Sequence, residues 1–315
     1  MNISPPEMNL YKPYNISNFY GASHIMSKIS KISHTNLMWR YWQHAWAPKE
    51  RQIDPEIIAT EPLDNRWKIY VARKDEVDSL AKFGYEAKAI SLPFAYVHKY
   101  FENFDREENS LLFMPTHSVH DTSVNFGPKF IKLLEELVDS EFNKYKRLYV
   151  SLHGDEINTK RKFYEKLGFR VILGAVNNDS NSLLRMKYFF QTFEYVVSDA
   201  LGSHIPYASL CGAKISLLVD KKTSYEFRKN PWLSSKNIHP DFFLLKTWAK
   251  EYSFLINSID ESKAHLDWAK KELGYQNILY PKEIKKEFGW NLPGRLSKRT
   301  YYFLSQIKQN LTNKQ

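Results

Sequence analysis

An alternation of short apolar runs and helix-length segments between residues 111 and 219 constrains the fold of this chain most strongly. The apolar runs have the length of strands and occupy residues 111–115, 147–153, 169–174, 193–199 and 213–219. The segments between them include FIKLLEELVDSEF and NTKRKFYEKLG, and glycines that commonly end helices follow two of them, at Gly168 and Gly212. Strands that alternate with helices predict an α/β fold with a parallel, doubly wound sheet.

The first hundred residues show a looser version of the same pattern. Strand-like runs occupy residues 37–46, 67–73 and 87–97. Helix-like segments occupy residues 17–33 and DEVDSLAKFG, which stops at Gly84. This part of the chain is therefore βαβ-like as well.

A polar stretch, FENFDREENS (residues 101–110), is the best candidate for a domain boundary. We predict one α/β domain over residues 1–105 and a second over 106–290, followed by a terminal helix over 291–315. Beyond about Lys221 the pattern is mostly helical.

Composition and charge narrow the class of protein. Hydrophobic residues make up 43% and charged residues 25%, which is typical of a globular chain, and the formal net charge of +10 favours an anionic partner. With Cys211 as its one cysteine the chain cannot form an internal disulfide. There is no signal-peptide pattern and no apolar run of membrane-spanning length, so we expect a cytoplasmic protein that can touch an anionic inner membrane peripherally.

Polar residues follow four of the expected strands. They are Thr116-His117-Ser118, His153 to Glu156, Gly174 to Asn178, and Asp199 to His204. In open α/β sheets ligands bind at the carboxyl ends of the strands. The sequence therefore predicts a binding site at this edge.

The turn Gly202-Ser203-His204 is the most informative of these strand ends. It joins an apolar strand to a short helix, where free backbone N–H groups and the helix dipole favour an anion. Gly202 would let a phosphate approach the backbone, and Ser203 and His204 can donate hydrogen bonds to it. An ordinary helix cap explains the same residues, so both readings stay open.

The segment MPTHSVHDTS (Met114 to Ser123) carries two histidines, several hydroxyls and Asp121. A metal site at His117, His120 and Asp121 lacks further ligands at a zinc-type spacing, so we predict no metal there. Hydrogen bonding of His117 and Ser118 to a nucleotide or sugar is the preferred reading. A purely structural histidine pair is the alternative.

Two further motifs carry candidate residues. In SLHGDE, His153, Gly154 and Glu156 can hold a ribose or sugar hydroxyl, although carboxylates also suit a helix start for dipole reasons. In YWQHAW, His44 can act as a general base because imidazole titrates near neutrality. A histidine packed among aromatic residues is the structural alternative.

Several signature motifs are absent from the sequence. We find no G-x-x-x-x-G-K-[ST], G-x-G-x-x-G, G-x-S-x-G, H-E-x-x-H, C-x-x-C or D-x-D pattern. The chain is therefore not an obvious kinase, dehydrogenase, serine hydrolase or zinc protease, and it differs from the metal-dependent glycosyltransferases that use D-x-D.

The same motifs resemble bacterial polysaccharide-biosynthesis proteins of glycosyltransferase type. In that group one strand leads into a Pro-x-His-Ser turn, present here as Pro115, His117 and Ser118. A later strand leads into a Gly-Ser/Thr-His turn followed by a tyrosine, present here as Gly202 to His204 and Tyr207. The resemblance covers about residues 111–290, including LGYQNILYPKEIKKEFGW, and the first hundred residues match only through WQHAW.

This resemblance implies a GT-B-like arrangement, in which two Rossmann-like domains face each other across a cleft and the terminal helix packs back on the first domain. The nucleotide-sugar would bind the second domain and the acceptor glycan or lipid-linked glycan mainly the first. The products would be capsule, O-antigen or related cell-surface glycans. The pattern is also loosely similar to enzymes that use CMP-activated acidic sugars, and it implies no cofactor besides the donor.

In such a transferase, hydrogen-bond donors stabilise the phosphate that leaves the sugar. We assign that role to Ser203 and His204, with His117 and Ser118 nearby. An inverting reaction also needs a base for the acceptor hydroxyl, for which His44 is the first candidate and Asp121 the second.

Three other functions remain open on the sequence. One is a noncatalytic scaffold of a glycan assembly complex, and another is a sugar-nucleotide epimerase of the same fold. The third is a nucleic-acid binder, which the charge suggests. The chain carries no recognisable nucleic-acid motif, so we expect no nucleic-acid partner.

Overall fold

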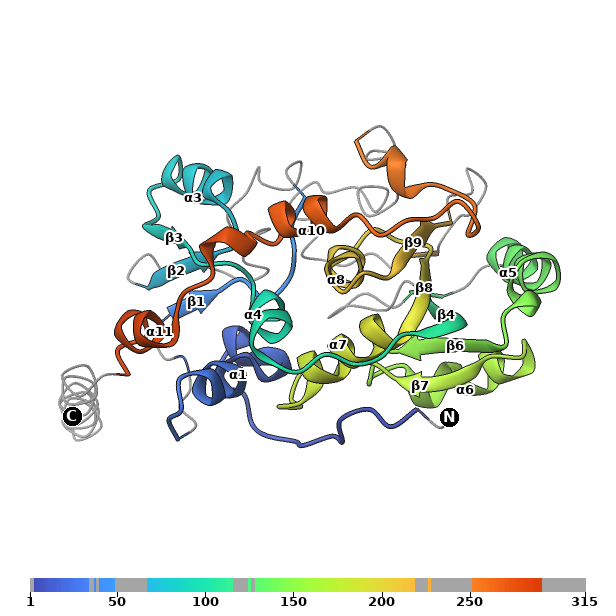
Figure 1. Cartoon of the computed structure of the whole chain (residues 1–315), viewed down its shortest axis with the longest axis horizontal. Helices are drawn as coiled ribbons and strands as arrows, with labels where there is room; N and C mark the ends of the chain where they lie inside the picture. The colour runs from blue at the N-terminus through green and yellow to red at the C-terminus, as the bar shows by residue number, and fades with distance from the viewer. Residues whose placement is uncertain are drawn as a thin grey trace, which may run out of the picture.

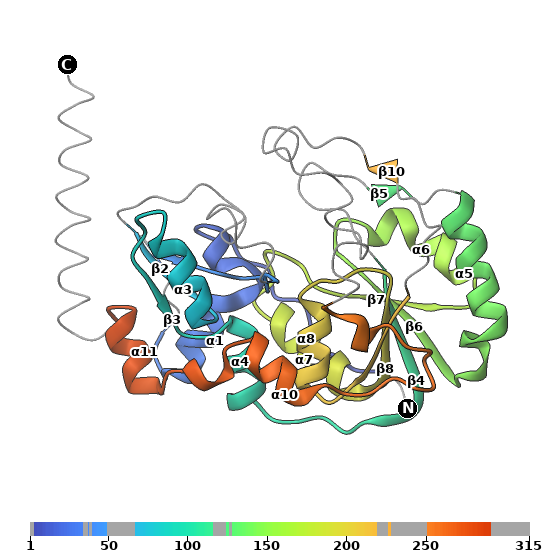
Figure 2. The same cartoon turned by 90° about the horizontal axis from the view of Figure 1, so that it is seen from above.

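The computed structural model describes residues 3–33, 37, 40–48, 67–115, 124–125, 128–218, 226–227 and 251–290. Within these ranges the chain forms a larger and a smaller parallel sheet, each covered by helices (Figures 1 and 2). A short antiparallel pair, β5 (Val124–Asn125) and β10 (Glu226–Phe227), stands apart from both sheets. The α/β class and the parallel strands agree with the prediction. The terminal helix predicted over 291–315 lies outside the described residues.

The larger sheet has five parallel strands in the order β7-β6-β4-β8-β9. Their bounds are β4 (Glu107–Met114), β6 (Arg147–Leu152), β7 (Arg170–Leu173), β8 (Phe193–Ser198) and β9 (Lys214–Leu217). Counted along the chain this is the order 3-2-1-4-5 of doubly wound nucleotide-binding sheets. All five predicted strands are therefore confirmed.

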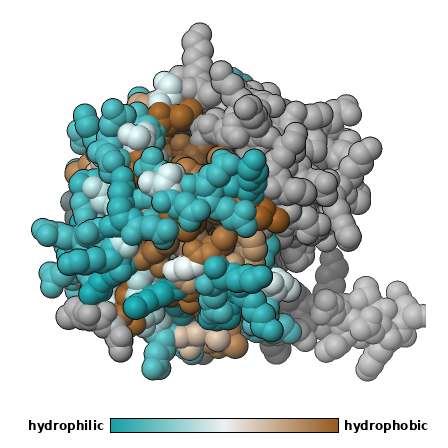
Figure 3. All heavy atoms as spheres, turned by 90° about the vertical axis from the view of Figure 1, so that its right-hand side faces the viewer, coloured by the Kyte–Doolittle hydropathy of each residue, from teal (hydrophilic) through white to brown (hydrophobic). Residues whose placement is uncertain are grey.

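The helices of this sheet lie on both of its faces, as doubly wound sheets require (Figure 2). Alternate residues of β4 point to opposite faces: Leu111 and Phe113 pack with α5 (Pro128–Ser140) and α6 (Ile157–Lys166), beside a short turn, η3 (Phe142–Lys144). Leu112 packs with α7 (Ser182–Thr192) and α8 (His204–Leu210) on the other face. Seen from the end of the molecule that carries α5 and α6, hydrophilic residues spread over the described surface with hydrophobic ones between them (Figure 3).

The smaller sheet consists of β1 (Arg40–Trp42), β2 (Lys68–Val71) and β3 (Ala87–Ala89), in that order. Helix α3 (Lys74–Ala81) covers one face of it through Leu80. The other face packs against α1 (Ala22–Ile29), which follows a 3₁₀ helix, η1 (Ile16–Gly21), and against α4 (Pro93–Tyr100).

One predicted element of the first hundred residues is corrected by the structure. The strand expected over 87–97 ends at Ala89, because Pro93 takes the first position of α4, where its missing N–H and fixed φ suit a helix start. Within the polar stretch 101–110, β4 begins at Glu107, in the second predicted domain, and Ser110 pairs in register with Arg147 of β6.

The chain returns to the smaller sheet at its far end. Residues 251–290 hold η5 (Ser253–Leu255), α10 (Leu266–Glu272), η6 (Tyr275–Asn277) and α11 (Pro281–Glu287). Phe288 lies 5.6 Å from the ring of Trp42 in β1 and 5.4 Å from that of Tyr70 in β2. The end of the segment expected in the second domain thus packs on the first sheet.

One cluster of buried hydrophobic side chains runs through both halves of the molecule. It includes Trp42 and Tyr70 of the smaller sheet, Phe94 of α4, and Leu112 and Val196 of the larger sheet. The described halves therefore share a continuous core. Every helix in the described ranges is too short or too polar to cross a bilayer.

Candidate functional site

The order of the larger sheet reverses between β4 and β8, and the carboxyl ends of these strands lie together. Met114 pairs with Ser198, whose hydroxyl donates a 2.7 Å hydrogen bond to the Met114 carbonyl. In doubly wound sheets this reversal opens the crevice in which ligands bind. The predicted turn Gly202-Ser203-His204 follows β8 directly. His117, Ser118 and Asp121 follow β4 in the chain but lie outside the described residues.

The His204 ring folds back over its own turn. Its Nε2 lies 2.8 Å from the hydroxyl of Ser198, and a Cβ built on Gly202 would stand 3.0 Å from the Nδ1 and Cε1 of the ring. Glycine at position 202 therefore makes room for the imidazole, a reason that differs from the close phosphate approach expected from the sequence.

Helix α8 offers only a modest anion site of its own. It has seven residues, and Ser203 at its N-cap makes no capping hydrogen bond with its side chain. The Ser203 hydroxyl instead accepts a 2.9 Å hydrogen bond from the backbone N–H of Trp46, beyond the end of β1. An anion at this turn would thus rely on side-chain donors more than on the helix dipole.

Tyr207 joins the two halves of the molecule. Its ring is buried and stacks on Phe94 of α4 at 4.1 Å with an interplanar angle of 8°. Its hydroxyl donates to the backbone carbonyl of His44 over 3.3 Å, and burial raises its pKa. The structure thereby brings His44 to the turn that contains Ser203, although 159 residues separate them in the chain (203 − 44).

His44 is partly buried among aromatic rings. The rings of Phe19 and Tyr20 lie 6.2 and 6.0 Å from its own. No described residue hydrogen-bonds its buried Nδ1. Desolvation lowers the pKa of His44 to about 4, so the imidazole is neutral at physiological pH. The neutral imidazole can therefore accept a proton, but its low pKa makes it a weak base as long as no negative charge lies nearby.

A buried charge network fixes the segment that carries His44. Arg73, at the end of β2, donates to the Ala47 carbonyl over 3.0 Å and pairs with Glu272 of α10, also over 3.0 Å. The Trp46 indole donates to the same Glu272 carboxylate over 2.8 Å. The sequence reasoning missed Arg73 and Glu272. An arginine at the end of a buried strand was the available signal for the first, whereas the second is recognisable only from the fold.

The residues that follow β6, His153 to Glu156, interact mainly with other residues of the chain. His153 Nδ1 lies 3.3 Å from the exposed carboxylate of Asp155, and the Gly154 N–H donates to the Ala175 carbonyl over 3.2 Å. Glu156 is buried and paired with Lys160 at 2.7 Å, one helical turn along α6. At this end a ligand hydroxyl would therefore meet Asp155 more readily than Glu156.

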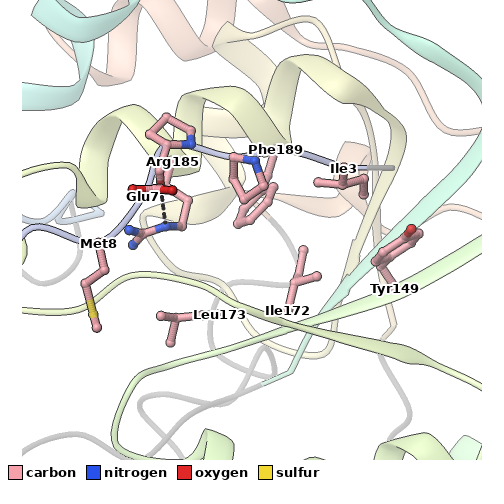
Figure 4. Close-up of a pocket in the computed structure, with 10 residues that line it drawn as sticks. Ile3, Glu7, Met8, Tyr149, Ile172, Leu173, Arg185 and Phe189 are labelled. Atoms are coloured by element: carbon pink, nitrogen blue, oxygen red, sulfur yellow. Dashed lines mark hydrogen bonds between the residues drawn. The ribbon is translucent and has the colours of Figure 1, made fainter. Parts of the chain in front are cut away.

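A hollow of about 580 Å³ lies elsewhere, beneath the N-terminal arm (Figure 4). Its walls are mostly apolar and include Pro6 of the arm, Ile172 of β7 and Phe189 of α7. Arg185 ties the arm down, because its Nε donates to the Pro6 carbonyl over 3.1 Å and its Nη1 pairs with the buried Asp179 at 2.6 Å. The N-terminal arm, held by Arg185, thus forms one wall of the hollow, and the hollow does not include the turn after β8.

The described residues contain no group of three or more His, Cys, Asp or Glu side chains that could hold a metal ion. The described residues around the turn after β8 supply the hydroxyls of Ser198 and Ser203 and the imidazole of His204. Such groups can orient a phosphate by hydrogen bonds and can accept a proton from a hydroxyl close to it.

Comparisons of the chain with protein-family models, with curated proteins and with solved structures each find no match.

Proposed function

We propose that this chain is a glycosyltransferase that moves a sugar from a nucleotide-sugar to a glycan or glycolipid acceptor. One observation carries the proposal: the turn after β8 stands where the order of a 3-2-1-4-5 sheet reverses, and the backbone of His44, just beyond β1 of the other sheet, is hydrogen-bonded to Tyr207 in the helix that follows this turn. Nucleotides bind doubly wound sheets at such reversals. The facing histidine supplies the second group that transfer needs.

The donor phosphate would bind at Gly202 to His204, with His117 and Ser118 completing its contacts. Transfer forms a bond between the acceptor oxygen and the anomeric carbon while the bond from that carbon to the phosphate oxygen breaks, its electron pair going to the phosphate. Hydrogen bonds from Ser203 and His204 would stabilise the departing charge. Removing one such donor costs about 3–4 kcal/mol of transition-state stabilisation.

His44 would take the proton of the acceptor hydroxyl, with Asp121 as the second candidate. Its lowered pKa makes it a weak base in the empty site. A bound phosphate would raise that pKa, since a nearby negative charge favours the imidazolium form. Base strength would then depend on donor binding, which protects the enzyme from abstracting protons without a donor.

The finer features expected from the resemblance remain proposals. They are a GT-B-like cleft between two Rossmann-like domains, transfer without a metal ion, a donor of the CMP-linked kind, and surface polysaccharide as the product. A cytoplasmic location with peripheral contact to the anionic inner membrane completes this picture. The net charge of +10 supports the last of these.

A noncatalytic binding protein of a glycan assembly complex is the second candidate. It is favoured by the engagement of Ser203 and Tyr207 in contacts that join the two halves. Residues that hold a core together need no ligand to explain them.

Donor turnover separates these functions. CMP-, UDP- and GDP-sugars would be incubated with the protein, with and without glycan acceptors, and free nucleotide would be measured. We expect release of one nucleotide, faster with an acceptor, and a loss of about 100-fold or more in His204→Ala. A variant outside the site, His98→Ala, should keep the rate. Release of none of the nucleotides would favour the binding protein, and an altered sugar still attached to its nucleotide would favour an epimerase.

A further inference from the structure

The chain makes a strained turn at Tyr20, inside the segment expected to be one helix over residues 17–33. Tyr20 has a φ of +58° and the next residue, Gly21, a φ of +81°. The left-handed conformation costs a residue with a side chain about 1–2 kcal/mol, whereas glycine or asparagine adopts it more readily. Strain of this kind gathers at functional sites, so a tyrosine here indicates a role for its side chain.

The backbone around Tyr20 is held on both sides. The Tyr20 N–H donates to the Asn177 carbonyl over 2.8 Å, and the Gly21 N–H donates to the Tyr11 hydroxyl over 3.1 Å. A Cβ on Gly21 would stand 2.3 Å from the Ser180 carbonyl oxygen, so the chain can pass the loop after β7 only with glycine. These contacts hold the backbone of the turn in place, and they therefore fix the position from which the Tyr20 side chain extends.

The side chain of Tyr20 lies where the two sheets meet. Its ring centre is 6.0 Å from that of His44 with a tilt of 34°. Burial raises the pKa of Tyr20 to about 12, with a smaller contribution from the negative charge of Asp155 at the end of β6. Burial raises the pKa of Tyr207 in α8, with a smaller contribution from Tyr20. The Tyr20 phenol is thus neutral at physiological pH, and its O–H can donate a hydrogen bond.

We propose that Tyr20 contacts the acceptor sugar and positions its hydroxyl against His44. This inference rests on the proposed glycosyl transfer. The aromatic ring suits the apolar face of a pyranose, and the phenol O–H suits one of its hydroxyls. The acceptor fits better than the nucleotide, because Tyr20 adjoins the base and comes from the half opposite the turn at Gly202.

The test compares two residues that share the left-handed conformation. Tyr20→Asn keeps the backbone but removes the ring, and Tyr20→Phe removes only the hydroxyl. Lys31, with a φ of +50° at the exposed end of α1, gives the matched control Lys31→Asn. For each protein we would measure the melting temperature, the KM for the donor with water as acceptor, and the KM for methyl glycosides at saturating donor.

For Tyr20→Asn we expect the KM for the methyl glycoside to rise about 10-fold, measured at a temperature at which the variant is folded, while the donor KM stays near that of the wild type. Tyr20→Phe should raise the same KM by about 3-fold, and Lys31→Asn should leave it unchanged. An unchanged acceptor KM in Tyr20→Asn, whatever its melting temperature, would overturn this inference and leave the proposed glycosyl transfer standing. A wild type that cleaves none of the donors would overturn the proposed function, and the role of Tyr20 with it.

Discussion

At the scale of single residues, His44 connects chemistry to stability. Its imidazole is desolvated in the folded protein, so the folded state binds a proton less readily than the unfolded chain. Its pKa falls from about 6.5 in the unfolded chain to about 4 in the fold. The unfolded state therefore holds more protons between these values, and stability should fall as the pH drops from 6.5 towards 4.

This shift predicts a specific pH dependence. At pH 5 the uptake of a proton by His44 in the unfolded chain should lower the free energy of unfolding by about 2 kcal/mol relative to pH 7. His44→Phe should remove that share, which urea denaturation at the two pH values would measure. His98, whose pKa is also lowered to about 4 by burial, should contribute a smaller share, because it is more exposed to solvent. Parallel pH profiles of wild type and His44→Phe would contradict the assignment.

Gly202 shows what sequence reasoning at one residue can and cannot reach. The turn and its position after an apolar strand were readable from the pattern of Tyr195 to His204. The packing of the imidazole over Gly202 was not, because it depends on the hydrogen bond between His204 and Ser198. Side-chain direction follows from the fold around a turn and not from the turn residues alone.

At the scale of elements, the buried strands were predictable and the helix that starts at Pro93 was not. Strands β4, β6 and β8 are apolar on both faces because helices cover both, which gives continuous hydrophobic runs. The apolar run 87–97 has the same appearance but divides between β3 and α4. Its composition suits a buried strand and a buried helix equally, and Pro93 marks the start of the helix.

The junction of α7 and α4 carries a prediction of its own. Lys187 of α7 is fully buried and donates to backbone carbonyls at the end of α4, including those of Phe101 at 2.7 Å and Glu102 at 2.8 Å. Lys187→Met would leave these acceptors unpaired and should cost about 3 kcal/mol in urea denaturation. Lys214→Met provides the control, because its pair with Glu194 is partly exposed and should cost less than about 1 kcal/mol. Equal losses in the two variants would contradict this role.

At the scale of the whole molecule, the site is a product of contacts between distant parts of the chain. The turn after β8 meets Trp46 across 157 residues, and Trp46 meets Glu272 across 226. Local patterns supplied the candidates His44, Ser203 and His204 separately. Nothing local placed them together, since their meeting depends on how one shared core packs two sheets side by side.

The central claim is that the turn at Gly202 to His204 binds the phosphate of a nucleotide. Titration calorimetry with CMP, UDP and GDP tests it most directly. We expect one nucleotide to bind the wild type, and His204→Ala to weaken its affinity by about 10-fold or more, as the loss of a hydrogen bond to a charged phosphate would. Equal affinity of the two proteins for that nucleotide, or binding of none of the three, would contradict the claim.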